Sequence, residues 1–93
     1  MTLKQIHAMF EVGQTWLATN TYQHKASGPR VLVQKLSAQL VWKTSMADRS
    51  WMKFPKASDI VEVRDGFLAF RLFPDGRRPD AIVTLTRKEE SMN

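Results

Sequence analysis

The chain has 93 residues, of which 43% are hydrophobic and 25% are charged, a length and composition typical of one small globular domain. It has no cysteine, so disulfides, thiolate nucleophiles and cysteine metal ligands are excluded. An excess of 14 lysines and arginines over 9 aspartates and glutamates gives a net charge of +5. That charge fits contact with a polyanion and fits equally well a role in solubility alone.

The sequence carries no signal for a membrane or for export. No run of about 18 apolar residues predicts a transmembrane helix, and residues 1–13 lack the apolar centre of a signal peptide. Small secreted domains usually depend on disulfides, which this chain cannot form. We therefore expect a cytoplasmic protein with no membrane partner.

A short helix is expected at the start of the chain. Thr2 and Gln5 match a capping box, in which two side chains each satisfy the other residue's backbone amide. Leu3, Ile6 and Phe10 recur at helical spacing and share one face. Because two turns of helix are not stable alone, we expect these three side chains to pack on the rest of the fold, plugging an open end.

Short strands separated by turns are expected in the rest of the chain. Residues 22–29, which include a Gly-Pro pair, and residues 45–50 have the composition of loops. Asp65-Gly66 lies between two apolar runs, which is the strongest short-range signal of a hairpin, and Pro74-Asp75-Gly76 is a further turn. The expected strands are Thr15–Thr21, Arg30–Leu36, Ala38–Thr44, Trp51–Phe54, Ile60–Val63, Phe67–Leu72 and Ala81–Thr86.

The spacing of these strands predicts the fold class. About five to seven short strands, with turns about every eight to twelve residues, are typical of a small barrel or a strongly bent antiparallel sheet. We expect a mostly β single domain, SH3-like or OB-like, because a flat sheet would leave long apolar edges exposed. Its parts are an N-terminal helix (1–12), a β-barrel (15–86) and a frayed tail (87–93). Strand alternation assigns to one core Leu32, Leu36, Leu68, Phe70, Leu72, Val83 and Leu85.

The residues that could perform catalysis are few and scattered. His7 falls at the margin of the helix and His24 in a loop, and neither belongs to a metal-binding motif. The carboxylates are spread singly except in the tail, and the glycines stand alone at turns, so neither an acid–base pair nor a phosphate loop is indicated. We expect no enzyme, no cofactor, no metal and no small-molecule substrate.

The three tryptophans, Trp16, Trp42 and Trp51, differ in their surroundings. A small domain needs one or two of them in its core. Two interpretations of Trp51 stay open: an exposed platform on which nucleic-acid bases stack, or a side chain buried wholly or partly in the core. Cations near Trp51 in the sequence favour the first interpretation, and they are Lys43, Arg49, Lys53 and Lys56.

Arg77 and Arg78 form a pair in the loop after the second turn. Such a pair can grip a phosphate or a carboxylate, but Asp75 and Asp80 flank it, and a solvated loop is the alternative. Arg71 lies on the outward face of its strand by alternation. The candidate binding residues, with phosphate contacts from the cations and stacking from the tryptophan, are Lys43, Arg49, Trp51, Lys53, Lys56, Arg71, Arg77 and Arg78.

One stretch resembles small proteins encoded by bacteriophages and prophages. It runs Ser50-Trp51-Met52-Lys53-Phe54-Pro55-Lys56-Ala57-Ser58 and is followed by Asp65-Gly66-Phe67. Gly13-Gln14-Thr15-Trp16 and the hairpin over 30–44 have the same general pattern, so the resemblance spans residues 12–72. It implies a setting in the bacterial cytoplasm during infection, where some small phage proteins disable a host defence protein or its nucleic-acid groove.

Two functions follow from these observations. The first is a non-enzymatic binding module that engages nucleic acid or a nucleoprotein complex through a basic, partly aromatic surface. The alternative is an inhibitor or adaptor that binds a host protein, such as an anti-CRISPR-like phage protein, through an apolar patch rimmed by charge. Salt separates the two, because phosphate contacts weaken steeply with ionic strength and apolar interfaces do not.

Overall fold

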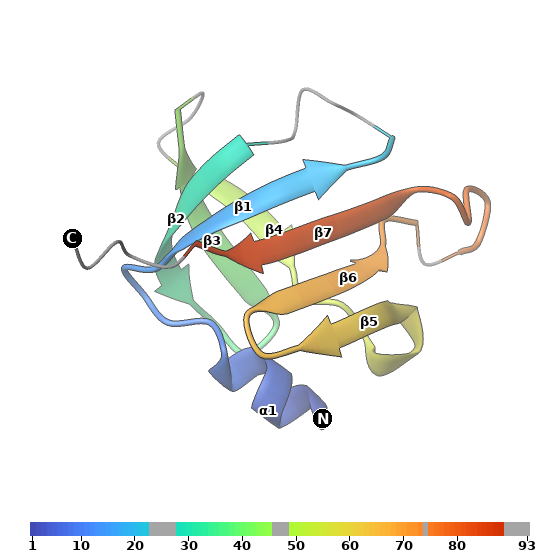
Figure 1. The fold of residues 1–93 in the computed structure, drawn as a ribbon, viewed down its shortest axis with the longest axis horizontal. Helices are drawn as coiled ribbons and strands as arrows, with labels where there is room; N and C mark the ends of the chain where they lie inside the picture. Colours follow the sequence, from blue (N-terminus) through green and yellow to red (C-terminus); the bar gives the residue numbers. More distant parts are fainter. Residues whose placement is uncertain (23–27, 46–48, 74, 89–93) are drawn as a thin grey trace.

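A computed structural model of the chain describes residues 1–22, 28–45, 49–73 and 75–88. In this part of the chain one short helix precedes a single seven-stranded sheet (Figure 1). The elements are α1 (Leu3–Ala8), β1 (Thr15–Asn20), β2 (Gly28–Lys35), β3 (Gln39–Thr44), β4 (Ser50–Lys53), the 3₁₀ helix η2 (Ala57–Asp59), β5 (Ile60–Arg64), β6 (Phe67–Arg71) and β7 (Ile82–Arg87).

The sheet has the strand order β4-β3-β2-β1-β7-β6-β5, and every neighbouring pair is antiparallel. The edge strands β4 and β5 follow each other in the sequence, so the chain between Lys53 and Ile60 must join the two edges. In a flat sheet of seven strands those edges would lie about 29 Å apart, whereas this link spans at most about 25 Å. The sheet must therefore curl.

The expected fold class is confirmed, as a strongly bent antiparallel sheet rather than a closed barrel. The sheet bends strongly around its core (Figure 1), but β4 and β5 do not pair, so the barrel is not closed. The register shifts between Leu32 and Gln34 in β2 and between Ile60 and Glu62 in β5, and such irregularities increase local twist. Asp65-Gly66 forms the expected hairpin turn, in which Gly66 has a φ of +80° that favours glycine.

The core fills the concave side of the sheet, and α1 covers one end of it (Figure 1). Phe10, just after α1, stacks on Trp16 with ring centroids 4.2 Å apart and meets Trp42 edge-on at 6.2 Å. Trp16 and Trp42 are fully buried, so two of the three tryptophans belong to the core as expected. The capping box is present, with Gln5 N–H donating to Thr2 Oγ1 at 3.1 Å.

The helix docks by its C-terminal end. Ile6 and Phe10 are buried as expected, but Leu3 is 40% exposed, and the expectation that it packs on the sheet is wrong. The reason is that α1 is only six residues long and its contact with the core is made by its last turn and by the residues after it. Met9, the residue that follows the helix, is 7% exposed and belongs to the core cluster.

Most of the expected core is confirmed, with one error. Leu32, Leu68, Phe70 and Leu85 are buried, whereas Leu36 is 38% exposed; Val83 packs against the core while partly buried, and Leu72 is partly exposed. The error at Leu36 has a physical cause in β2. Leu32 of β2 pairs with Trp42 of β3, but Gln34 pairs with the next residue of β3, Val41, so β2 contains one extra residue at position 33. The alternation shifts by one, and Leu36 turns to the convex side.

All the expected strands form, with ends that differ by at most two residues. β2 begins at Gly28, so Gly28 and Pro29, expected in the loop over 22–29, instead pair with β1. Pro29 precedes the first residue of β2 that pairs with β3, so a strand end accommodates it.

β7 continues through Arg87, whose Nη2 lies 3.1 Å from Asp65 Oδ2, and the Lys88 N–H donates to the Thr15 carbonyl at 2.9 Å. The sheet therefore includes the first residue of the segment expected to be a frayed tail. Residues 89–93, Pro74 and the loop residue His24 lie outside the described part of the chain.

The buried position of Phe70 leads to a test of the strand register. Replacing Phe70, which is 6% exposed, by alanine removes a large side chain from the core and should lower the free energy of unfolding by about 3–5 kcal/mol. Val61→Ala on the adjacent edge strand, where the side chain is 55% exposed, should change it by less than about 1 kcal/mol. Urea denaturation of both variants measures this, and equal midpoints for Phe70→Ala and the parent would contradict the register.

The docking of α1 by its C-terminal end can be tested with a matched pair of substitutions. Ile6→Ala should cost about 2–5 kcal/mol because Ile6 is 2% exposed, while Leu3→Ala, at 40% exposure, should cost less than about 1 kcal/mol. Alanine is a strong helix former, so neither change weakens the helix itself. Equal losses of stability would show that the helix packs through its whole apolar face.

Candidate binding surface

The convex side of β3 and β4 carries a solvent-exposed tryptophan. Trp51 in β4 lies opposite Val41 in β3, and neighbouring pairs place Leu40 and Met52 on the other, concave side. Trp51 is 58% exposed and lies outside the core cluster, so the exposed position is confirmed, while base stacking stays a prediction. Val41 is fully buried although it is not part of the core cluster, as expected for a valine that the opposing indole and its neighbours cover from the convex side.

Three of the expected cations surround this tryptophan. Arg49 and Lys53 are two residues before and after Trp51, which puts the three side chains on one face at a spacing of about 6.7 Å along the strand. Lys43 lies two residues from Val41 on the same face of β3, and it is exposed like the other two cations. We call Lys43, Arg49, Trp51 and Lys53 the convex patch.

The positive charge of the chain is concentrated in one stretch of the sequence. Residues 21–58 contain seven lysines and arginines and one acidic residue, Asp48, so this segment alone carries +6. The other segments together carry −1, because they hold the remaining seven cations and eight acids. This asymmetry is visible in the sequence, and the pairing of β2, β3 and β4 places four of these cations on neighbouring strands, namely Arg30, Lys35, Lys43 and Lys53.

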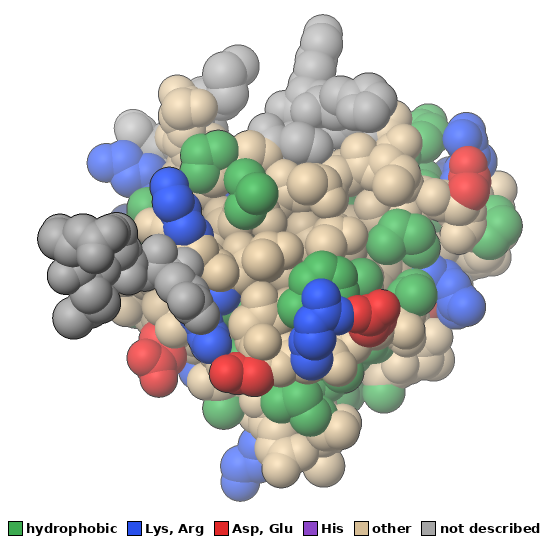
Figure 2. Space-filling view, viewed as in Figure 1, with side chains coloured by type: hydrophobic (Ala, Val, Ile, Leu, Met, Phe, Trp, Pro, Cys, Tyr) green, Lys and Arg blue, Asp and Glu red, His purple; other side chains and the backbone are tan. Residues whose placement is uncertain are grey.

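Four arginines elsewhere in the described chain pair with carboxylates. Arg64 pairs with Glu62, and Arg87 pairs with Asp65. Figure 2, which looks onto the face of β1, β7 and β6, shows acidic side chains beside basic ones. By contrast, no carboxylate of the described residues lies within ion-pair distance of the cations of the convex patch.

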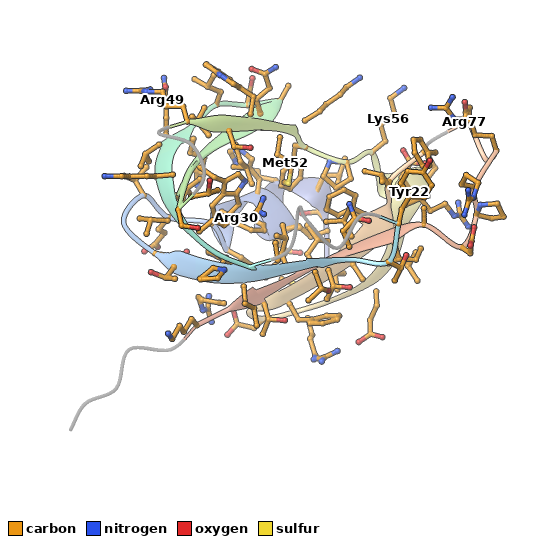
Figure 3. All side chains as sticks on the ribbon, turned by 90° about the horizontal axis from the view of Figure 1, so that it is seen from above. Tyr22, Arg30, Arg49, Met52, Lys56 and Arg77 are labelled. Carbon is orange, nitrogen blue, oxygen red and sulfur yellow. The ribbon has the colours of Figure 1, made fainter. Side chains whose placement is uncertain are left out.

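Arg77 and Arg78 do not join the convex patch. Their Nε atoms lie 3.4 Å from carboxylate oxygens of Asp75 and Asp80, respectively. Hydrogen bonding from the Arg78 guanidinium lowers the pKa of the Asp80 carboxyl. The two guanidinium groups also lie over the rings of Phe73 and Tyr22, at 4.5 and 4.8 Å. Arg49 and Arg77 lie at opposite ends of the molecule (Figure 3), so one ligand would have to be long to contact both.

Lys56 and Arg71 lie on the rim of a cleft beside β4. The cleft occupies the open side of the sheet, where β4 faces β6, and its volume is 370 Å³. The Arg71 side chain donates from Nη1 to the Ser58 carbonyl at 3.2 Å. The lining residues are Trp51, Met52, Lys53, Phe54, Pro55, Lys56, Asp59, Phe70, Arg71 and Leu72.

A second pocket of 240 Å³ adjoins this cleft and contains a cation that the sequence analysis did not single out. Arg30 lies inside the curl of the sheet near Met52 (Figure 3). Burial lowers the pKa of its guanidinium because desolvation disfavours the charged form. Strand alternation contained the signal, since Arg30 is two residues before the buried Leu32 and therefore shares its concave face.

The side chain of His7 is held by two contacts with the rest of the fold. Its Nε2 lies 2.8 Å from the Leu36 carbonyl oxygen, and its ring meets Phe54 edge-on at 5.2 Å. Across residues 1–22, 28–45, 49–73 and 75–88, no three histidine or acidic side chains gather closely enough to hold a metal ion. Within the same ranges, no helix has the length and apolar character needed to cross a membrane.

Comparisons of the chain with protein families, with curated proteins and with solved structures find no significant match. The resemblance to small phage proteins therefore stays a prediction.

Proposed function

We propose that this chain is a non-enzymatic module that binds single-stranded nucleic acid, free or within a nucleoprotein complex, through the convex patch. The observation that carries this proposal is an exposed Trp51 with Arg49 and Lys53 two residues before and after it, Lys43 on the neighbouring strand, and no described carboxylate within ion-pair distance of these cations. On the evidence of the phage resemblance, we extend the proposal to the bacterial cytoplasm during infection.

The chemistry of the patch suits an unpaired strand better than a duplex. An exposed indole offers a flat apolar face on which a base can stack, and every base has such a face, so stacking tolerates any sequence. In a duplex the bases are already stacked and paired, and only the phosphates are accessible to a flat surface. Trp51 and Lys53 alternate along β4, and Arg49 immediately precedes this strand, so cations lie before and after the stacking position, where the backbone of an extended strand would pass.

Arg77 and Arg78 have no direct part in this proposal. Asp75 and Asp80, their carboxylate partners, are exposed, and exposed ion pairs add little stability. The two carboxylates nevertheless bring the net charge of the loop close to zero, so it attracts a polyanion only weakly. Lys56 and Arg71, at the rim of the cleft, can add long-range attraction toward a polyanion. The second candidate function, binding of a host protein as an inhibitor or adaptor, is favoured by a different observation, the apolar cleft along the open edge of β4.

The cations of the convex patch can be tested through the salt dependence of binding. The parent should bind a fluorescent single-stranded oligonucleotide at about 50 mM salt and micromolar protein, with an affinity that falls steeply as salt is added. Single substitutions Lys43→Ala, Arg49→Ala and Lys53→Ala should each reduce the slope of log affinity against log salt by about 0.7, the value for one phosphate contact on a single strand.

Lys4→Ala, on an exposed position of α1, is the matched control, and its slope should equal that of the parent. A parent that shows no binding under the low-salt condition would rule out the nucleic-acid function, because non-specific phosphate contacts alone are detectable there. The protein-binding function would then be the leading candidate.

Substitutions of Trp51 distinguish the contribution of base stacking from that of charge. Trp51→Ala should weaken binding by about 1–3 kcal/mol per stacked base and leave the salt slope unchanged, whereas Trp51→Phe should keep part of the affinity. Thermal melting should accompany the titration because Trp51 lies over Val41. Loss of affinity in Trp51→Ala together with a smaller salt slope would contradict the assigned role, and so would full affinity in that variant.

A further inference from the structure

The edge strand β4 has backbone groups that no strand pairs with. The Phe54 N–H donates to the Ala38 carbonyl at 2.8 Å, so residue 54 faces β3 in the ladder. In antiparallel sheets this orientation alternates along the strand, so Met52 also faces β3, while the N–H and C=O groups of Trp51 and Lys53 point to the open side. Within the described ranges, none of these groups takes part in a hydrogen bond outside the β3–β4 ladder.

The open side of β4 adjoins the 370 Å³ cleft described above. Met52 and Phe54 line it from the β4 side, and Phe70 and Leu72 line it from β6 and the residue after it. Met52 and Phe54 are only partly buried and pack against the core. The cleft therefore presents apolar side chains next to a row of unpaired backbone donors and acceptors.

We propose that the β4 edge binds an extended acidic peptide segment, which adds to the sheet as a further strand. This goes beyond the proposed nucleic-acid function and does not depend on it. Unpaired edges attract other strands, and proteins usually cover or shorten them. Here the unpaired edge lies beside an apolar cleft. In β-strand addition, such an edge supplies affinity through backbone hydrogen bonds, and such a cleft supplies specificity by accepting alternate side chains.

The alternation of an added strand defines the peptide that fits. Residues opposite Trp51 and Lys53 would project to the convex side, and the residue opposite Met52 would project into the cleft. Cleft positions therefore require apolar side chains. Convex positions meet Arg49 and Lys53, and the rim of the cleft adds Lys56 and Arg71 against one buried carboxylate, Asp59, so acidic side chains are favoured there.

A second copy of this chain fits the same edge less well. If two β4 strands paired antiparallel about Trp51, Arg49 of one copy would lie opposite Lys53 of the other. Like charges directly opposite each other destabilise an antiparallel pair. An acidic strand at this edge would instead place its carboxylates opposite Arg49 and Lys53.

The probe for this site is a capped peptide of alternating glutamate and valine, six residues long, titrated into the full chain and followed by NMR. The amide protons of Trp51 and Lys53 should become protected from exchange on binding, while the amide protons of Met52 keep the protection that they already have. A peptide with lysine in place of every glutamate should not bind.

A matched pair of variants isolates the backbone contribution. Lys53→Ala and Lys53→Pro both remove the ammonium group, but only proline removes the N–H, and an edge strand tolerates proline where its N–H points away from the sheet. We expect Lys53→Pro to bind the glutamate–valine peptide about tenfold more weakly than Lys53→Ala, the effect of one lost hydrogen bond and its unsatisfied partner.

Thermal melting verifies that both variants fold. If Lys53→Pro does not fold, a peptide N-methylated at the amides that would face β4 supplies the same comparison from the ligand side. Equal affinity of the two variants, or of the methylated and unmethylated peptides, would overturn strand addition. No binding at about 1 mM peptide would do so as well, as would a dimer of the free chain whose Trp51 and Lys53 amides are already protected. Oligonucleotide binding by the parent is measured separately, so either proposal can fail without the other.

Discussion

The short connection between Lys53 and Ile60 is the constraint on which the rest of the structure depends. It joins the two edge strands of a seven-stranded sheet and is too short to cross a flat sheet of that width. The sheet must curl until β4 and β5 approach each other, and the curl creates one concave side. Phe10, Trp16 and Trp42 fill that side, and α1 covers one end. A core of this size is possible in a small chain because the sheet encloses it from most directions.

The same constraint produces the surfaces that remain open. Because β4 and β5 approach without pairing, a cleft stays between β4 and β6, with the unpaired backbone of β4 along it. Alternate residues of β3 and β4 project to the opposite, convex side, where the exposed Trp51 is paired with Val41. The two proposed binding sites thus share one strand. A strand added along the cleft would bind the backbone of β4 and would also meet Arg49 and Lys53, two cations that the convex patch offers to nucleic acid.

Charge distinguishes the two halves of the sheet. Residues 21–58 have an excess of six cations, and they form β2, β3 and β4 at one edge. The other edge holds nearly balanced charges in close ion pairs, such as Arg64 with Glu62 and Arg87 with Asp65. Exposed pairs of this kind add little to stability, but they cancel the field that would attract a polyanion. Attraction over longer distances therefore originates from the β2–β4 edge.

The sequence by itself determined what depends on local interactions: the capping box of Thr2 and Gln5, the hairpin at Asp65-Gly66, the approximate strands, and the net charge. Alternation also identified Leu32, Leu68, Phe70 and Leu85 as core. Tertiary structure alone decided the rest. The extra residue at position 33 of β2 turned Leu36 outward, and docking of α1 by one end left Leu3 exposed. The exposure of Trp51 and the separation of Arg49 from Arg77 followed from strand order, because residues separated along the chain come together only through pairing that no local pattern encodes.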